Sequence, residues 1–69
     1  MNKTRYCKIP LRETIERLNN GLETFVEYYG KKYAVVYGSY DRYIVFKTEN
    51  STHKITMSGL FDYFYYVKS

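Results

Sequence analysis

The sequence predicts one α+β domain over residues 1–69, with an N-terminal helix, a four-stranded antiparallel meander sheet and a short C-terminal helix covering one sheet face. Three observations predict this fold class. The chain has 69 residues, which is enough for one domain. Apolar residues recur with a helical period as far as residue 22 and then form short runs. Turn-forming residues separate these runs, which is typical of an antiparallel meander.

The segment "IPLRETIERLNNGL", residues 9–22, predicts the first helix. Pro10 suits the first helical turn, where its missing N–H is not needed. Glu13 and Arg17 stand four residues apart in the favourable order for an ion pair. Gly21 can adopt the left-handed conformation that often ends a helix. The predicted apolar stripe of this helix consists of Leu11, Ile15, Leu18 and Leu22.

Short runs rich in β-branched and aromatic residues predict four strands, at residues 22–29, 32–37, 42–48 and 53–57. A two-residue loop of Gly30 and Lys31, with glycine first, suits a type II′ turn between the first two strands. The segments "GSYD" and "ENST" predict the two later turns. Together these turns predict the cross-strand pairs Val26 with Val35, Val35 with Ile44, and Phe46 with Ile55.

Because side chains alternate along a strand, this register sorts them onto two faces. We expect one face to pack against the helix and to hold Val26, Tyr28, Tyr33, Val35, Ile44, Phe46, Ile55 and Met57. We expect the other face to be open and to hold Phe25, Glu27, Tyr29, Lys32, Ala34, Val36, Tyr43, Val45, Lys47, Lys54 and Thr56.

The last segment, "SGLFDYFYYVKS", is compatible with two structures. Ser58 suits a helix N-cap, and Leu60, Phe64 and Val67 would share one helical face. The stretch "DYFYYV" also has strong strand propensity. We expect the helix, because four strands already make a plausible sheet and its apolar face needs a cover.

The predicted open face is the candidate binding site. The predicted register places Lys32, Lys47 and Lys54 side by side, and like charges in that arrangement are unfavourable without compensation. An anionic partner would compensate them, whereas lysines that simply extend into solvent need none. Aromatic and turn residues near the lysines complete the predicted partner-binding set, which is Lys32, Lys47, Lys54, Tyr29, Tyr43, Phe25, Tyr40 and Arg42.

The sequence holds no recognisable catalytic constellation. His53 is the single histidine and has no second catalytic group beside it, so we expect a surface or half-buried ring. No phosphate-binding glycine loop or metal-ligand cluster is present in the sequence, which predicts a protein without cofactor or metal that is not an enzyme. The single cysteine, Cys7, suits the reducing cytoplasm of a bacterial host. No apolar run reaches the ~20 residues of a membrane span.

One resemblance rests on the order of a helix, a strand, "YGS" at residues 37–39, a strand and "HKITM" at residues 53–57. In these features the chain resembles small messenger-RNA-cleaving toxins with a double-stranded-RNA-binding-like fold. Those toxins carry a catalytic histidine directly after a Gly-Ser pair. Tyr40 stands at that position here, so the resemblance implies the architecture and not the activity.

The net charge of +4 favours an anionic partner. The leading expectation is a small phage or mobile-element protein that docks through the open face on an acidic surface of a host protein and inhibits it. The host protein would be one that handles nucleic acid or serves in defence. The alternative is direct binding of single-stranded DNA or RNA by the same basic and aromatic face. A homodimer contact through that face is a third possibility.

Overall fold

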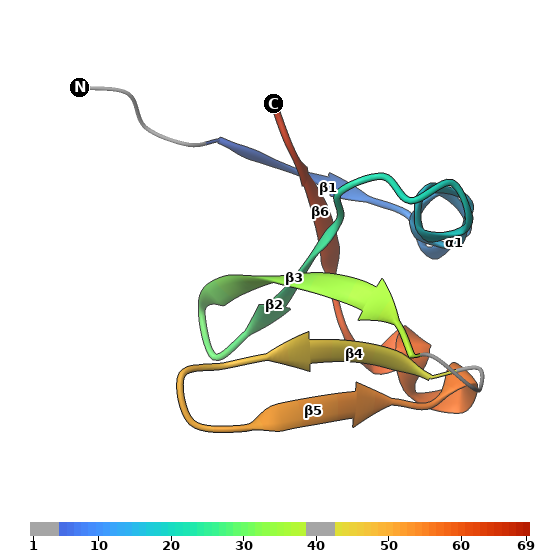
Figure 1. The fold of residues 1–69 in the computed structure, drawn as a ribbon. Helices are drawn as coiled ribbons and strands as arrows, with labels where there is room; N and C mark the ends of the chain where they lie inside the picture. The colour runs from blue at the N-terminus through green and yellow to red at the C-terminus, as the bar shows by residue number, and fades with distance from the viewer. Residues whose placement is uncertain (1–4, 39–42) are drawn as a thin grey trace.

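The computed structural model describes residues 5–38 and 43–69, which form one antiparallel sheet with an α-helix and a 3₁₀ helix (Figure 1). The described part of the sheet has six strands in the spatial order β1-β6-β2-β3-β4-β5. The elements along the chain are β1 (Tyr6–Ile9), α1 (Leu11–Asn19), β2 (Phe25–Tyr28), β3 (Lys31–Tyr37), β4 (Ile44–Lys47), β5 (Thr52–Ile55), η1 (Met57–Asp62) and β6 (Tyr65–Lys68).

The predicted fold class, with four strands and two helices, is therefore wrong. The four expected strands are present as the consecutive part β2-β3-β4-β5 of the sheet. The chain adds two strands to them, because β6 forms where a helix was expected and β1 precedes α1.

The register differs from the predicted one by two residues at each hairpin. Val26 pairs with Tyr33, Val35 with Phe46, and Ile44 with Ile55. A shift of two residues keeps every side chain on its own face, because side chains alternate with a period of two. The division into two faces is therefore confirmed for the residues that lie in strands, although the individual partners are not. Two residues of the predicted faces lie elsewhere, since Tyr29 stands in a turn and Met57 begins η1 and is 43% exposed.

The first hairpin turns at Tyr29 and Gly30, and not at the predicted Gly30 and Lys31. Tyr28 pairs with Lys31, which leaves a two-residue loop. Both loop residues have positive φ, 48° at Tyr29 and 78° at Gly30, as a type I′ turn requires. Such a turn suits the right-handed twist of the strands better than an ordinary turn does. It places a tyrosine in a conformation that bulky residues rarely adopt.

Helix α1 is shorter than predicted and turns its first three stripe residues toward the sheet. Leu18 is buried, and Leu11 and Ile15 are partly buried against the core. Leu22 lies beyond the helix and is 49% exposed, so it does not belong to the stripe. Gly21 has φ of 69°, the left-handed conformation expected after the helix. Arg17 donates to the carbonyl of Glu23 from Nε and Nη2, at 3.2 and 2.7 Å, and the ion pairs of the described residues do not include one between Arg17 and Glu13.

The segment after β5 forms one 3₁₀ helix and then a strand. Thr56, and not Ser58, caps η1, because its Oγ1 accepts from the backbone N–H of Gly59 at 3.3 Å. Leu60 is buried as expected, whereas Phe64 is 53% exposed. Tyr65 is buried, and its hydroxyl donates to the carbonyl of Leu60 at 3.0 Å. This bond ties the start of β6 to η1.

The core lies on the face of the sheet that receives α1 and η1. Figure 1 shows β6 running steeply across the direction of β3, β4 and β5, so the sheet is strongly twisted. The twist wraps the core-facing side chains of all six strands around the two helical segments. The buried cluster consists of Ile9, Leu18, Val26, Val35, Ile44, Phe46, Ile55, Leu60 and Tyr65.

We predict that Tyr65→Phe lowers the free energy of unfolding by about 1 kcal/mol near neutral pH, because the buried carbonyl of Leu60 loses its donor. Burial raises the pKa of Tyr65 above its ordinary value of 10.0. The protonated tyrosine therefore stabilises the fold fully below that value, and its contribution is lost as the pH rises above it. The variant should approach the parent in stability above about pH 10. Urea denaturation near pH 7 and pH 11 checks this, and an unchanged difference would contradict it.

Candidate functional site

The open face is the side of the sheet opposite α1 and η1. Alternation along the strands and the observed register determine its members. The term "open face" below means Tyr6, Lys8, Phe25, Glu27, Lys32, Ala34, Val36, Val45, Lys47, Thr52, Lys54, Tyr66 and Lys68. Tyr43 and Phe64, which directly precede β4 and β6, add their rings beside it.

The charges on this face are strongly one-sided. It carries five lysines and one acidic residue, Glu27, which together equal the net charge of +4 of the whole chain. The whole chain has eleven Lys and Arg and seven Asp and Glu, so six of each sign remain in the rest of the sequence. The excess positive charge of the protein therefore equals the excess on its open face. The lysines are Lys8, Lys32, Lys47, Lys54 and Lys68.

Four of these lysines lie against aromatic rings. The distance from Nζ to the ring centroid is 3.7 Å for Lys8 over Phe64, 5.0 Å for Lys68 over Phe25 and 5.7 Å for Lys54 over Tyr43. Lys32 lies 4.5 Å from the centroid of Tyr66 and 5.6 Å from that of Tyr6. A cation within about 6 Å of a ring is attracted by the negative ring face. These contacts hold each ammonium group near the sheet surface.

Lys32 also pairs with the one carboxylate of the face. Its Nζ lies 2.9 Å from Oε1 of Glu27, which is the directly opposite residue on β2. This hydrogen bond is the main reason that the pKa of Glu27 lies below its ordinary value, and a hydrogen bond with Tyr66 acts in the same direction. The pKa of Tyr66 is raised, mainly by burial and then by its bond to Glu27. The open face therefore contains one neutralised position at Lys32.

The structure does not gather the three predicted lysines in a row. Lys32 pairs with Glu27, Lys54 lies opposite Val45, and Lys47 lies opposite Thr52. The predicted repulsion between directly opposite lysines is therefore wrong. The common face of the three lysines is confirmed by the register.

The other predicted site residues lie in different surroundings. Phe25 is on the open face but only 6% exposed, because Tyr6 packs edge-on against it at 5.3 Å. Tyr29 is not on the face, since it stands in the hairpin turn and contacts Tyr28. Tyr43 lies beside the face under Lys54. Tyr40 and Arg42 fall outside the described residues.

Four residues of the face come from strands that were not predicted. β1 contributes Tyr6 and Lys8, and β6 contributes Tyr66 and Lys68. The signal was present as a period of two in "YCKI" and "YYVK", where an inward residue alternates with an outward one. Each run has only four residues, which is too short for that period to outweigh a helical pattern.

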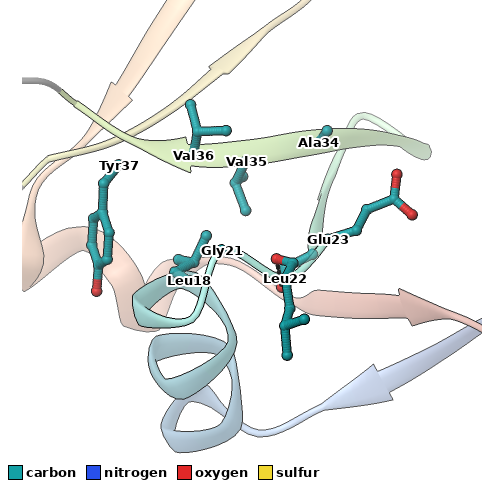
Figure 2. A pocket seen from close by; sticks show the side chains of 9 residues that line it. Leu18, Gly21, Leu22, Glu23, Ala34, Val35, Val36 and Tyr37 are labelled. Atoms are coloured by element: carbon teal, nitrogen blue, oxygen red, sulfur yellow. Dashed lines mark hydrogen bonds between the residues drawn. The ribbon is translucent and has the colours of Figure 1, made fainter.

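A mostly apolar hollow of about 360 Å³ lies between the end of α1 and β3 (Figure 2). Figure 2 shows Val35 directed toward Leu18, whereas Val36 points to the opposite side of β3. Val36 is 60% exposed, and with Ala34 and Val45 it forms an apolar strip in the open face. The residues lining the hollow are Leu18, Gly21, Leu22, Glu23, Thr24, Ala34, Val35, Val36 and Tyr37.

His53 is half-buried, as expected, and its ring stacks on Phe46 with centroids 4.9 Å apart. Its Nε2 lies 2.9 Å from Oγ of Ser51. Nucleophilic catalysis by such a pair also needs a group that orients the histidine. The hydrogen bonds of the described residues give His53 no such partner. Among the same residues no group of three or more His, Cys, Asp or Glu is placed to hold a metal ion.

Comparison of the chain with protein-family models, with curated proteins and with solved structures gives no match. Within residues 5–38 and 43–69, no helix has the length and apolar character that crossing a membrane requires.

We predict that Glu27→Gln lowers stability near neutral pH, because Lys32 loses its anionic partner. The folded-state pKa of Glu27 is depressed, so the stabilisation is present above its ordinary value of 4.5 and is lost as the pH falls through the lower folded-state value. The difference between parent and variant should therefore shrink under acid conditions. Urea denaturation across this range is the measurement, with Glu13→Gln on α1 as the control for removing one negative charge. A difference that does not vary with pH would contradict the assigned pairing.

Proposed function

We propose that this protein is a non-catalytic binding protein whose open face binds single-stranded nucleic acid. The observation that carries the proposal is that one sheet face holds a charge equal to that of the whole chain, with the lysines interleaved with aromatic rings. Proteins that bind single strands combine a positive surface along the backbone with rings on which bases stack. β1 and β6 extend this pattern across the sheet, which favours nucleic acid over the expectation of a host-protein partner.

The positions of the lysines suit this function. In four of the five lysines the Nζ sits over or beside a ring at the end of a flexible four-carbon chain. When the ammonium group swings outward to a phosphate, the ring face beneath it becomes accessible to a base. One side chain therefore contributes to the phosphate contact while its neighbour contributes to stacking. Contacts with phosphates and stacking on ring faces do not distinguish one base from another, so binding would be largely independent of the nucleotide sequence.

A second candidate function is docking on an acidic surface of another protein. The exposed apolar strip of Ala34, Val36 and Val45 favours it, because exposed apolar patches rimmed by charge often mark protein interfaces. The expectation of an inhibitor of a host protein, encoded by a phage or mobile element, belongs to this candidate and stays a prediction. Both candidates use the same lysines and differ in the partner.

We predict that Lys47→Glu together with Lys54→Glu weakens binding to single-stranded oligonucleotides while the protein stays folded, because both side chains are exposed. Fluorescence anisotropy with labelled DNA and RNA, single- and double-stranded, measures this. If all five lysines reach phosphates, log Kd should change with log salt by about 3.5, since each single-strand contact contributes about 0.7.

The matched control compares Lys54→Glu with Arg12→Glu, an equal charge change at an exposed position of α1. Only the first should reduce affinity beyond the effect of net charge. Binding that is absent at physiological salt, or that both variants reduce equally, would contradict nucleic-acid recognition by this face. Partner proteins captured by the parent chain but not by the double variant would then favour the second candidate.

We predict that Tyr43→Ala weakens binding by roughly 1–3 kcal/mol, because its ring lies beneath Lys54 and is placed to stack on a base. The loss should persist at high salt, since stacking does not release counterions. Phe61→Ala is the control, because Phe61 is an 80% exposed ring on η1. An equal loss for both variants in the same anisotropy assay would contradict the stacking role of Tyr43.

A further inference from the structure

The tips of two hairpins lie side by side at one end of the sheet, as Figure 1 shows for the β2–β3 and β4–β5 turns. A shallow hollow of about 320 Å³, open to solvent, lies between them. None of the open-face lysines lines it. The term "tip hollow" below means the space bounded by Tyr28, Tyr29, Lys31, Tyr33, Thr48, Glu49, Asn50, Ser51 and His53.

Tyr29 at the edge of the tip hollow combines two unfavourable features. Its φ of 48° is an outlier for a bulky side chain, and its ring is 90% exposed to solvent. The turn type favours asparagine before glycine, which would avoid the strain. Tyr28 holds the Tyr29 ring edge-on at 4.5 Å, so the exposed ring is restrained in one direction. A restrained and exposed tyrosine loses little conformational entropy when a partner covers it.

The charges at the tips are self-complementary. Lys31 on one tip and Glu49 on the other lie 3.6 Å apart, and each side chain is 67% exposed. An exposed pair of this kind contributes little to the stability of a single chain, so it can exchange partners readily. The tip is also electrically balanced, in contrast to the open face. Two copies of a chain with a charge of +4 meet less repulsion at this end than at the open face.

We propose that the tip hollow binds the tip of a second copy of this chain, with Tyr29 of each copy inserted into the hollow of the other. A two-fold axis between the tips places the β2–β3 turn of one copy on the β4–β5 turn of the other. Lys31 of each copy then faces Glu49 of the second copy. The contact is isologous, because the tyrosine and the hollow that receives it belong to the same surface.

The dimer is expected to be weak. Each buried tyrosine removes about 150–250 Å² from water, and the small tips add little area around it, so the interface falls below the ~1,200 Å² of stable complexes. Its consequence goes beyond the proposed function, because dimerisation at the tips leaves both open faces uncovered. Two linked faces would then bind one long nucleic-acid strand with the gain of bivalency.

Sedimentation equilibrium of the purified protein without nucleic acid, over roughly a hundredfold range of chain concentration, tests the proposal independently of the proposed function. The parent should pass from monomer to dimer. Tyr29→Ala should weaken the dimer about thirtyfold or more, because it removes both anchors. Phe61→Ala, which removes an exposed ring elsewhere, should not. A parent that is monomeric throughout, or a Tyr29→Ala variant that dimerises like the parent, overturns the proposal.

Tyr29→Asn separates binding from folding. At low concentration it should raise Tm by about 4 °C or more, because asparagine tolerates the positive φ, while the dimer is lost. Lys31→Glu alone and Glu49→Lys alone should each remain monomeric, since each places like charges at both tips. An equal mixture of the two should form heterodimers. Failure of the mixture to associate would overturn the assigned ion pairs, because a purely intramolecular pair cannot be restored by mixing.

Discussion

The antiparallel pairing of β6 with β1 on one side and β2 on the other joins the two ends of the chain into one sheet. Successive side chains of β6 point to opposite faces of the sheet, so this pairing has a separate consequence on each face. On the inner face it buries Tyr65, whose hydroxyl reaches back to Leu60 and ties η1 to the core. On the outer face it places Tyr66 and Lys68 beside Phe25 and Lys32. The core and the candidate site therefore depend on the same strand.

The sequence predicts the face on which most strand residues lie, because that face depends only on the alternation of side chains along the strand. Each hairpin register differs from the expected one by two residues, and Val26, Phe46 and Ile55 still point to the core. The same tolerance does not extend to cross-strand neighbours, which change with every shift. The predicted row of lysines required the individual partners and therefore failed, while the predicted common face required only the alternation.

The two ends of the chain could not be predicted by the same reasoning. Four-residue strands offer two inward positions each, and one inward residue of β6, Val67, also fits a helical pattern with Leu60 and Phe64. Residues 65–68 form a strand because the edge of β2 supplies backbone hydrogen-bond partners once the remaining sheet has formed. This information lies in the tertiary arrangement and not in the segment. Tyr6 and Tyr66 enter the open face only through these two strands.

The tyrosines of the chain have different roles, and the role of each depends on its place in the fold. Tyr65 and the half-buried Tyr28 and Tyr33 fill the inner face, where burial raises the pKa of Tyr28 and Tyr65. Tyr66 supports a lysine and a carboxylate on the outer face. Tyr29 fits neither role, since it adds no burial in the single chain and occupies strained backbone. A contact outside the chain would cover the exposed ring and offset part of this strain. A second copy of the chain supplies such a contact, because the hollow beside Tyr29 and the opposed charges of Lys31 and Glu49 are present on every copy.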